Sequence, residues 1–238
     1  MNLSEKKELI EYLCNFFSEE RINRIREIAE KRTRHVSVVV ENLYQSHNIS
    51  AILRTVECLG IQDVHIIENN FQYEISRQVA LGAHKWLSVY QYNQQGNNTI
   101  PCLEEIKKQG YKIIATLPHE EDCLLDDIPI DEKTAFVFGT EHQGLTQEAI
   151  AMADGFVKIP LYGFTESYNV SVSVALTMMN VVERLRKSQF NWKLSQEEQT
   201  DLELQWIKNS IKDVDRIIDR YHKIKRGCVF TENPFNKL

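Results

Sequence analysis

Short apolar runs alternate with helical segments through the middle of the chain, and this alternation restricts the fold more than any other feature. A β-branched run at 35–41 precedes a helical segment that ends near Gly60, and a second run follows at 64–68. Four further runs cover 86–90, 111–117, 134–138 and 155–160. Strands that alternate with helices pair in parallel, and helices then cover both faces of the sheet. The sequence therefore predicts an α/β fold with a parallel sheet.

Helical segments of a different character flank this region. Residues 4–31 carry an approximate apolar stripe among charges, and residues 196–224 form a second long amphipathic pattern. Between the sheet and this pattern, residues 169–186 are apolar enough for a largely buried helix. We expect three parts: a basic helical arm at 1–34, an α/β domain at 35–188 and a helical extension at 189–238.

Charge is distributed unevenly along a chain whose formal net charge is −6. Residues 1–34 hold 8 basic and 7 acidic side chains and residues 183–227 hold 11 and 8, whereas residues 35–182 hold 8 and 18. The most basic stretch contains Arg24, Arg26, Arg32 and Arg34. Clustered cations neutralise phosphates, so the flanks are candidates for binding RNA. The alternative is that these cations only form a solvent-exposed helix face without a binding partner.

Several classes of protein and site find no support in the sequence. No stretch approaches the roughly 20 apolar residues that span a bilayer, and the charged first residues differ from a secretory signal peptide. The five cysteines are widely separated and form no Cys/His cluster with zinc spacing. We therefore expect a cytoplasmic protein with no membrane segment and no metal.

Three polar blocks follow strand ends, where α/β proteins build their sites. The first block, residues 41–60, carries Asn48, Ser50 and Arg54. Either Asn48 or Ser50 fits the N-cap of the following helix. Arg54 lies in a mostly apolar helix, and a semi-buried guanidinium needs an anion, either a phosphate or a neighbouring carboxylate. The candidate carboxylates are Glu41 and Glu57.

The second block, residues 136–150, is a buried strand that breaks at Gly139, presents Glu141 and breaks again at Gly144. Paired glycines allow a backbone to approach a ligand closely. The block matches neither the dinucleotide fingerprint nor the phosphate-binding P-loop, which disfavours a nicotinamide-dependent enzyme. Taken alone, it is also consistent with an ordinary strand, turn and helix.

The third block, residues 158–186, is a strand, a loop and the apolar helix. Ser167 and Asn169 stand where this helix begins, and Asn169 also fits a simple N-cap. No single block defines a function.

In order, spacing and content, the three blocks resemble the motifs of the SpoU/TrmH family of RNA ribose 2′-O-methyltransferases, within the SPOUT superfamily. The resemblance covers residues 32–188, including the AHKW stretch at 83–86. The short N-terminal helix, the long C-terminal helix and the length are most similar to the tRNA enzymes that methylate the D-loop guanosine at position 18. Such an enzyme uses S-adenosyl-L-methionine (SAM), and its fold contains a deep C-terminal trefoil knot.

The resemblance also implies roles for particular residues and for a second copy of the chain. At the cofactor site it places Thr116, Gly139, Ile159 and Tyr168, the last in a position where members usually have leucine. At the catalytic site it places Arg54, Asn48, Glu141, Ser167 and Asn169. Family members work as homodimers, for which helix 169–186 is a candidate interface, although a core helix fits equally well. The basic flanks, with Arg24, Arg26, Arg32 and Arg34, would grip tRNA.

The chemistry implied by the resemblance leaves the role of Arg54 open. A ribose hydroxyl must lose a proton before it attacks a methyl donor, so the enzyme supplies alignment and a proton acceptor. Arg54 either accepts that proton or fixes a phosphate and stabilises the alkoxide. The target is also open at this point. Other tRNA positions or ribosomal RNA are alternatives, as is a catalytically inactive RNA-binding protein built on the same scaffold.

Overall fold

A computed structural model gives the fold of this chain and describes residues 1–70, 80–117, 123–140 and 143–227. The chain divides into two compact units. One comprises residues 32–193, and the other comprises residues 1–31 together with the segment from residue 194 onward. The terminal segments, expected as separate parts, therefore belong to one unit.

The unit formed by residues 32–193 is built on a parallel sheet with the strand order β3-β2-β1-β6-β4-β7-β5. Its strands are β1 (Val36–Glu41), β2 (Asp63–Ile67), β3 (Ser88–Tyr92), β4 (Lys112–Thr116), β5 (Cys123–Leu124), β6 (Thr134–Phe138) and β7 (Gly155–Lys158). The predicted parallel sheet is confirmed. Only β5 was not predicted, because two residues carry no periodicity.

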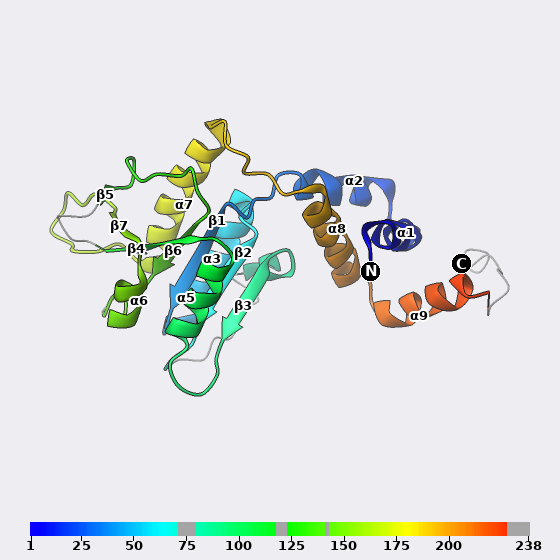
Figure 1. Cartoon of the computed structure of the whole chain (residues 1–238), viewed down its shortest axis with the longest axis horizontal. Coiled ribbons are helices and arrows are strands. Elements are labelled where there is room, and N and C mark those ends of the chain that lie inside the picture. The colour runs from blue at the N-terminus through cyan, green and yellow to red at the C-terminus, as the bar shows by residue number, and fades with distance from the viewer. Residues whose placement is uncertain (71–79, 118–122, 141–142, 228–238) are drawn as a thin grey trace. The chain divides into compact units, whose positions relative to one another are not determined.

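Helices cover both faces of this sheet, as Figure 1 shows. They are α3 (Ser46–Leu59), the short 3₁₀ turn η1 (Ala83–Lys85), α5 (Thr99–Lys108), α6 (Gln147–Met152) and α7 (Val170–Lys187). Helices α3 and α7 pack together on one face, and α5 and α6 pack together on the other. Because all strands are parallel, their carboxyl ends meet along one edge of the sheet, where connecting loops build a site.

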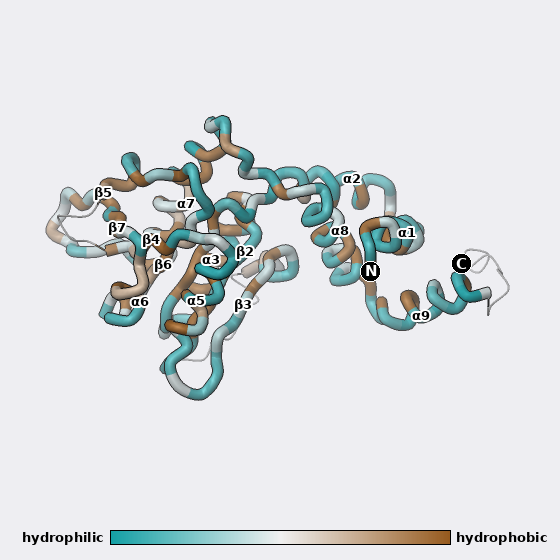
Figure 2. The backbone as a smooth tube through the Cα atoms, in the orientation of Figure 1, coloured by the Kyte–Doolittle hydropathy of each residue, from teal (hydrophilic) through white to brown (hydrophobic). Residues whose placement is uncertain are grey.

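Two apolar clusters form the core, one on each face of the sheet. Alternate residues of β1 divide between them: Val38 packs with α3 and α7, whereas Val39 packs with α5 and α6. Every residue of β1, β2 and β6 is buried, which explains their continuous apolar runs. In Figure 2 the hydrophobic segments accordingly follow the strands and the inner sides of the helices.

The second unit is helical and consists of α1 (Leu3–Cys14), α2 (Glu19–Ala29), α8 (Gln196–Ser210) and α9 (Val214–Lys225). The helical stretch expected over 4–31 consists of two helices, because Ser18 caps a new helix by accepting a hydrogen bond from the Arg21 amide. The expectation of one long helix over 196–224 was wrong, since the chain turns at Asp213 with a φ of 55°. Apolar periodicity continues across both breaks, so it did not reveal them.

Helix α8 holds this unit together by packing against α1 and α2. Its Trp206 is fully buried, and so are Leu9 and Leu13 of α1. Ion pairs join the same elements: Lys6 with Asp201 at 2.5 Å, and Arg26 with Glu203 at 2.7 Å. Across the described parts of the chain, no helix combines the length and apolar content of a membrane span.

Candidate functional site

A pocket of about 500 Å³ lies at the carboxyl edge of the sheet, beyond the ends of β4, β6 and β7. Its walls come from segments that are far apart in the sequence. They include Thr116, Leu117, Phe138, Gly139, Thr140, Gln143, Gly144, Leu145, Ile159, Leu161, Ser167 and Tyr168. A pocket of this size, lined by polar and apolar side chains in similar measure, suits a small organic ligand that carries several polar groups.

The four predicted cofactor residues all line this pocket. Thr116 ends β4, and its hydroxyl donates to the Val137 carbonyl of β6 at 2.9 Å, which fixes its side chain between two strands. The Tyr168 hydroxyl donates to the Pro160 carbonyl at 3.4 Å and so spans the loop between β7 and α7. The phenol at this position is therefore accommodated by the loop itself.

The loop after β6 is closed at its base by backbone contacts. The amide of Thr140 donates to the Gly144 carbonyl and the amide of Gly144 donates to the Thr140 carbonyl, both at 3.0 Å. A Cβ on Gly139 would lie 2.2 Å from the carbonyl group of Gly144. We expected the paired glycines to let a ligand approach the backbone closely. At Gly139 the missing side chain instead makes room for the backbone of Gly144.

Asn48 and Asn169 meet although 121 residues separate them. The Asn169 Nδ2 atom donates to Asn48 Oδ1 at 3.1 Å, which joins the first and third sequence blocks. Asn169 also caps α7, because its Oδ1 accepts from the Ser171 amide at 2.9 Å. The alternative that Asn48 or Ser50 caps α3 is wrong, since α3 begins at Ser46 and both lie inside it.

Arg54 is exposed on α3, which corrects the prediction of a semi-buried guanidinium. The carboxylates considered as its partners are engaged elsewhere: Glu57 pairs with Arg32, and Glu41 accepts from threonines. Within the described parts of the chain, Arg54 makes no hydrogen bond or ion pair. Its charge is therefore available to a ligand that approaches from solvent.

Of the two remaining catalytic candidates, the structure describes Ser167 but not Glu141. Ser167 is exposed and lines the pocket, close in sequence to Asn169. Glu141 lies outside the described residues, between the anchored positions Thr140 and Gly144. The pocket also contains Gln143, Leu117 and Leu161, which the sequence did not single out, although each lies in a segment that follows a strand end. That position was the available signal.

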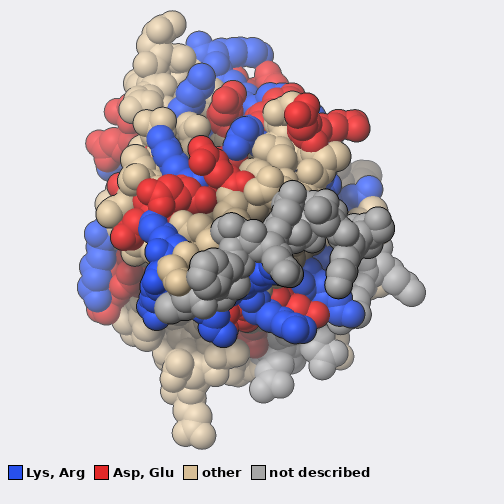
Figure 3. All heavy atoms as spheres, turned by 90° about the vertical axis from the view of Figure 1, so that its right-hand side faces the viewer, with Lys and Arg blue, Asp and Glu red and all other residues tan. Residues whose placement is uncertain are grey.

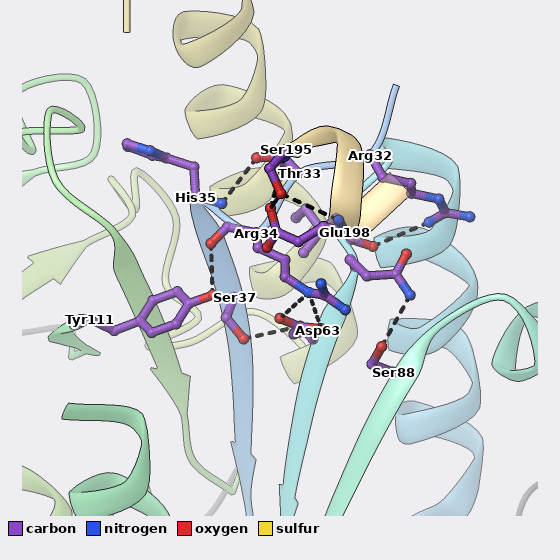
Figure 4. Close-up of polar contacts among 12 residues, drawn as sticks. Arg32, Thr33, Arg34, His35, Ser37, Asp63, Ser88, Tyr111, Ser195 and Glu198 are labelled. Carbon is purple, nitrogen blue, oxygen red and sulfur yellow. Dashed lines mark hydrogen bonds and ion pairs between the residues drawn. The ribbon is translucent and has the colours of Figure 1, made fainter. Parts of the chain in front are cut away.

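Two of the arginines expected to bind RNA are engaged by carboxylates of their own unit. Arg32 is 1% exposed and donates to the Glu57 carboxylate at 2.7 Å and to the Ile61 carbonyl at 3.2 Å. Burial lowers the pKa of Arg32, and the Glu57 charge opposes this shift. Arg34 donates from Nε to both oxygens of Asp63, at 3.1 and 3.2 Å (Figure 4). Both guanidinium groups point toward carboxylates of their own unit, which makes Arg32 unavailable to RNA.

The other two arginines lie on the helical unit and remain candidates. Arg24 pairs with Glu27 at 3.0 Å, and Arg26 pairs with Glu203 at 2.7 Å; the two arginine side chains are 62 and 49% exposed. On the face that Figure 3 shows, lysines and arginines lie interspersed with acidic side chains. A cation that is paired in this way loses its carboxylate contact when it binds a phosphate, which reduces its contribution.

Comparison with known proteins places these features in a family. Residues 35–179 match the SpoU rRNA Methylase family. A tRNA (guanosine(18)-2'-O)-methyltransferase of Borreliella burgdorferi is 37% identical over 201 residues, which is 84% of this chain and 90% of the relative.

Solved structures agree with the sequence match. The A. aeolicus TrmH/SpoU tRNA modifying enzyme has 30% identity and a TM-score of 0.72, covering 82% of this chain and 98% of its own. AviRb of Streptomyces viridochromogenes, a SpoU methyltransferase solved with its cofactor AdoMet, shares the fold at 20% identity and a TM-score of 0.58, covering 66% of this chain and 63% of its own. The chain therefore belongs to the SpoU rRNA methylase family.

Proposed function

We propose that this protein transfers a methyl group from SAM to a ribose 2′-hydroxyl of tRNA, at the D-loop guanosine of position 18. The observation that carries the proposal is that the three sequence blocks meet at one place. Asn169 of the third block donates a hydrogen bond to Asn48 of the first, and Gly139 and Ser167, of the second and third blocks, line the pocket. The relative that matches 84% of the chain is named for this reaction.

The pocket fits SAM in size and in the character of its walls. The apolar side chains of Phe138, Ile159 and Leu161 suit the flat purine and the aliphatic chain of the ligand, while the hydroxyls of Thr116 and Ser167 suit its polar groups. When bound, SAM supplies an activated methyl group on a positively charged sulfur. In the described residues no group of three or more His, Cys, Asp or Glu side chains is arranged to hold a metal ion.

We propose that Arg54 binds an RNA phosphate and stabilises negative charge on the ribose oxygen. Its guanidinium is exposed and makes no ion pair in the described residues, so it offers five donors to an approaching anion. The alternative, in which Arg54 accepts the proton, requires a neutral guanidinium, and solvent exposure does not favour that state. Asn48, Asn169 and Ser167 would orient the ribose, together with Glu141.

A homodimer is the assembly that we propose. Helix α7 exposes Val172, Leu176 and Met179 to 43, 41 and 51%, and their spacing of four and three residues places them on one helix face. Light scattering is expected to give twice the chain mass of 27.8 kDa. A monomeric mass would refute the dimer.

We also propose the trefoil knot that the resemblance implies. The segment after β5 lies against α7, where Arg184 donates to the carbonyls of Leu125 and Ile128 at 2.9 and 2.6 Å. Strand β5 itself pairs with β7. These contacts hold the segment 123–128 between a strand and the final helix of the unit, and the resemblance to the family supports the knot.

The organisation and location of the enzyme complete the proposal. We propose a methyltransferase domain at 35–188 that works in the cytoplasm, with tRNA gripped by the flanks through Arg24 and Arg26. Arg34 contributes only if its bond to Asp63 opens.

The test of the proposed function is incubation of purified protein with methyl-labelled SAM and unmodified tRNA, followed by nuclease digestion and nucleoside mapping. Label in 2′-O-methylguanosine from the D-loop is the expected result. Label at another tRNA position or in ribosomal RNA would move the target and keep the reaction. SAM binding without transfer to any RNA would instead support an inactive RNA-binding protein.

A further inference from the structure

Glu41 is a carboxylate that the proposed chemistry does not use, although it lies at the edge of the sheet where the site is built. It ends β1 and is 1% exposed. Val40 of β1 is paired in register with Phe138 of β6, so Glu41 lies level with the start of the loop that follows β6. A buried carboxylate requires hydrogen bonds or a charge partner.

Three donors satisfy this carboxylate, and they come from two different helix starts. Oε1 accepts from the hydroxyl of Thr99 at 2.5 Å and from that of Thr146 at 2.7 Å. Oε2 accepts from the Thr146 amide at 2.9 Å. Thr146 is the N-cap of α6, and its hydroxyl also accepts from the Ala149 amide at 3.2 Å. Glu41 therefore fixes the residue at which the loop after β6 enters α6.

This loop forms one wall of the pocket. It begins at Gly139, closes through the Thr140 and Gly144 pair, and ends at Thr146, with Leu145 lining the pocket next to it. One end of the loop is held by strand β6 and by the close packing of the Gly144 backbone against Gly139. Glu41 holds the other end.

We propose that Glu41 is a positioning residue for the SAM site, acting through Thr146 to hold residues 143–146 against the pocket. The inference deepens the proposed function and rests on it. Only a carboxylate meets all three donors, because it has two acceptor oxygens and no N–H group. An amide with its oxygen on the two threonine hydroxyls would turn its NH₂ group toward the Thr146 backbone N–H, which can only donate.

The test is the variant Glu41→Gln, studied as the full chain by calorimetric titration with SAM and by steady-state kinetics. We expect the Kd for SAM to rise about 10-fold, the effect of one buried donor that loses its acceptor. KM for SAM should rise in parallel, while the affinity for tRNA stays at the wild-type value. A merely structural role would lower the urea midpoint and leave the SAM affinity of the folded protein unchanged.

The matched control is Glu68→Gln. Glu68 follows β2, is 8% exposed and accepts from Gln91 at 3.4 Å, and no hydrogen bond joins it to the described residues of the loop. Its amide variant should bind SAM like the wild type. Equal losses of SAM affinity in both variants would overturn the proposal, because burial alone would then explain them.

A second pair of variants, at Thr146, tests the same proposal if Glu41→Gln folds poorly. Thr146→Val removes the hydroxyl and keeps the carboxylate, so it should also weaken SAM binding, whereas Thr146→Ser should restore it. In a double-mutant cycle, Glu41→Gln and Thr146→Val should be non-additive. Wild-type SAM affinity in Glu41→Gln or in Thr146→Val would overturn the inference.

The wild type is assayed in parallel to separate the two proposals. SAM binding without methylation of tRNA would contradict the proposed function, while the SAM affinities of the variants would still decide the role of Glu41. A wild type that does not bind SAM would overturn both.

Discussion

Replacement of Arg32 by methionine tests whether this arginine is structural. Methionine keeps the aliphatic part of the side chain and removes the guanidinium. The loss includes bonds to the Glu57 carboxylate at 2.7 Å and to the carbonyls of Ile61 and Glu57 at 3.2 and 3.3 Å. Two of these acceptors belong to Glu57 in the last turn of α3, where a cation also interacts favourably with the helix dipole.

The size of the effect follows from burial. Removing one partner of a buried pair costs about 3–5 kcal/mol. The side chain of Glu57 is 25% exposed and regains water when Arg32 is absent, so the lower end, about 3 kcal/mol, applies. For a protein of this size that corresponds to a fall in Tm of about 6–12 °C.

The assay is urea unfolding followed by tryptophan fluorescence and circular dichroism, with tRNA affinity measured on the folded protein. The matched control is Arg24→Met, whose partner Glu27 lies at the surface and whose midpoint should equal that of the wild type. An Arg32→Met variant with a wild-type midpoint and weaker tRNA binding would refute the structural role and return Arg32 to the RNA-binding surface.

Three further changes test other parts of the structure. Gly139→Ala places a Cβ against the Gly144 backbone and should cost about 1–3 kcal/mol and weaken SAM binding. Gly163→Ala, whose Cβ would lie at an ordinary contact distance of 4.0 Å from the Thr165 amide nitrogen, should do neither in the same titration. Arg54→Lys should retain the wild-type urea midpoint and lose most methyl transfer, because a lysine lacks the planar fork of donors; retention of most turnover would contradict its role. Burial lowers the pKa of His65 to about 4, so on acidification the unfolded chain takes up a proton at a higher pH than the folded protein does. Wild-type stability should then fall as the pH drops from about 6.5 toward 4, and His65→Phe should flatten this slope in urea unfolding; equal slopes would contradict the burial of a neutral histidine.

Much of the fold was predictable because its signals are local. The strands at 36–41, 63–67 and 134–138 are buried on both faces, and burial on both faces produces continuous β-branched runs. The helix breaks near Ser18 and Asp213 were missed, since apolar periodicity describes which face is buried and not where the chain turns.

The order of the three blocks, their glycines and their polar residues were properties of the sequence by itself, and they led to the family and to the residues of the pocket. Tertiary structure alone decided which side chains meet. Asn48 reaches Asn169, and Glu41 reaches Thr146 across 105 residues, because parallel strands bring their carboxyl ends to one edge. It also exposed Arg54 and buried Arg32, two arginines that composition cannot distinguish, since the burial of a charge depends on the partners that the fold brings to it.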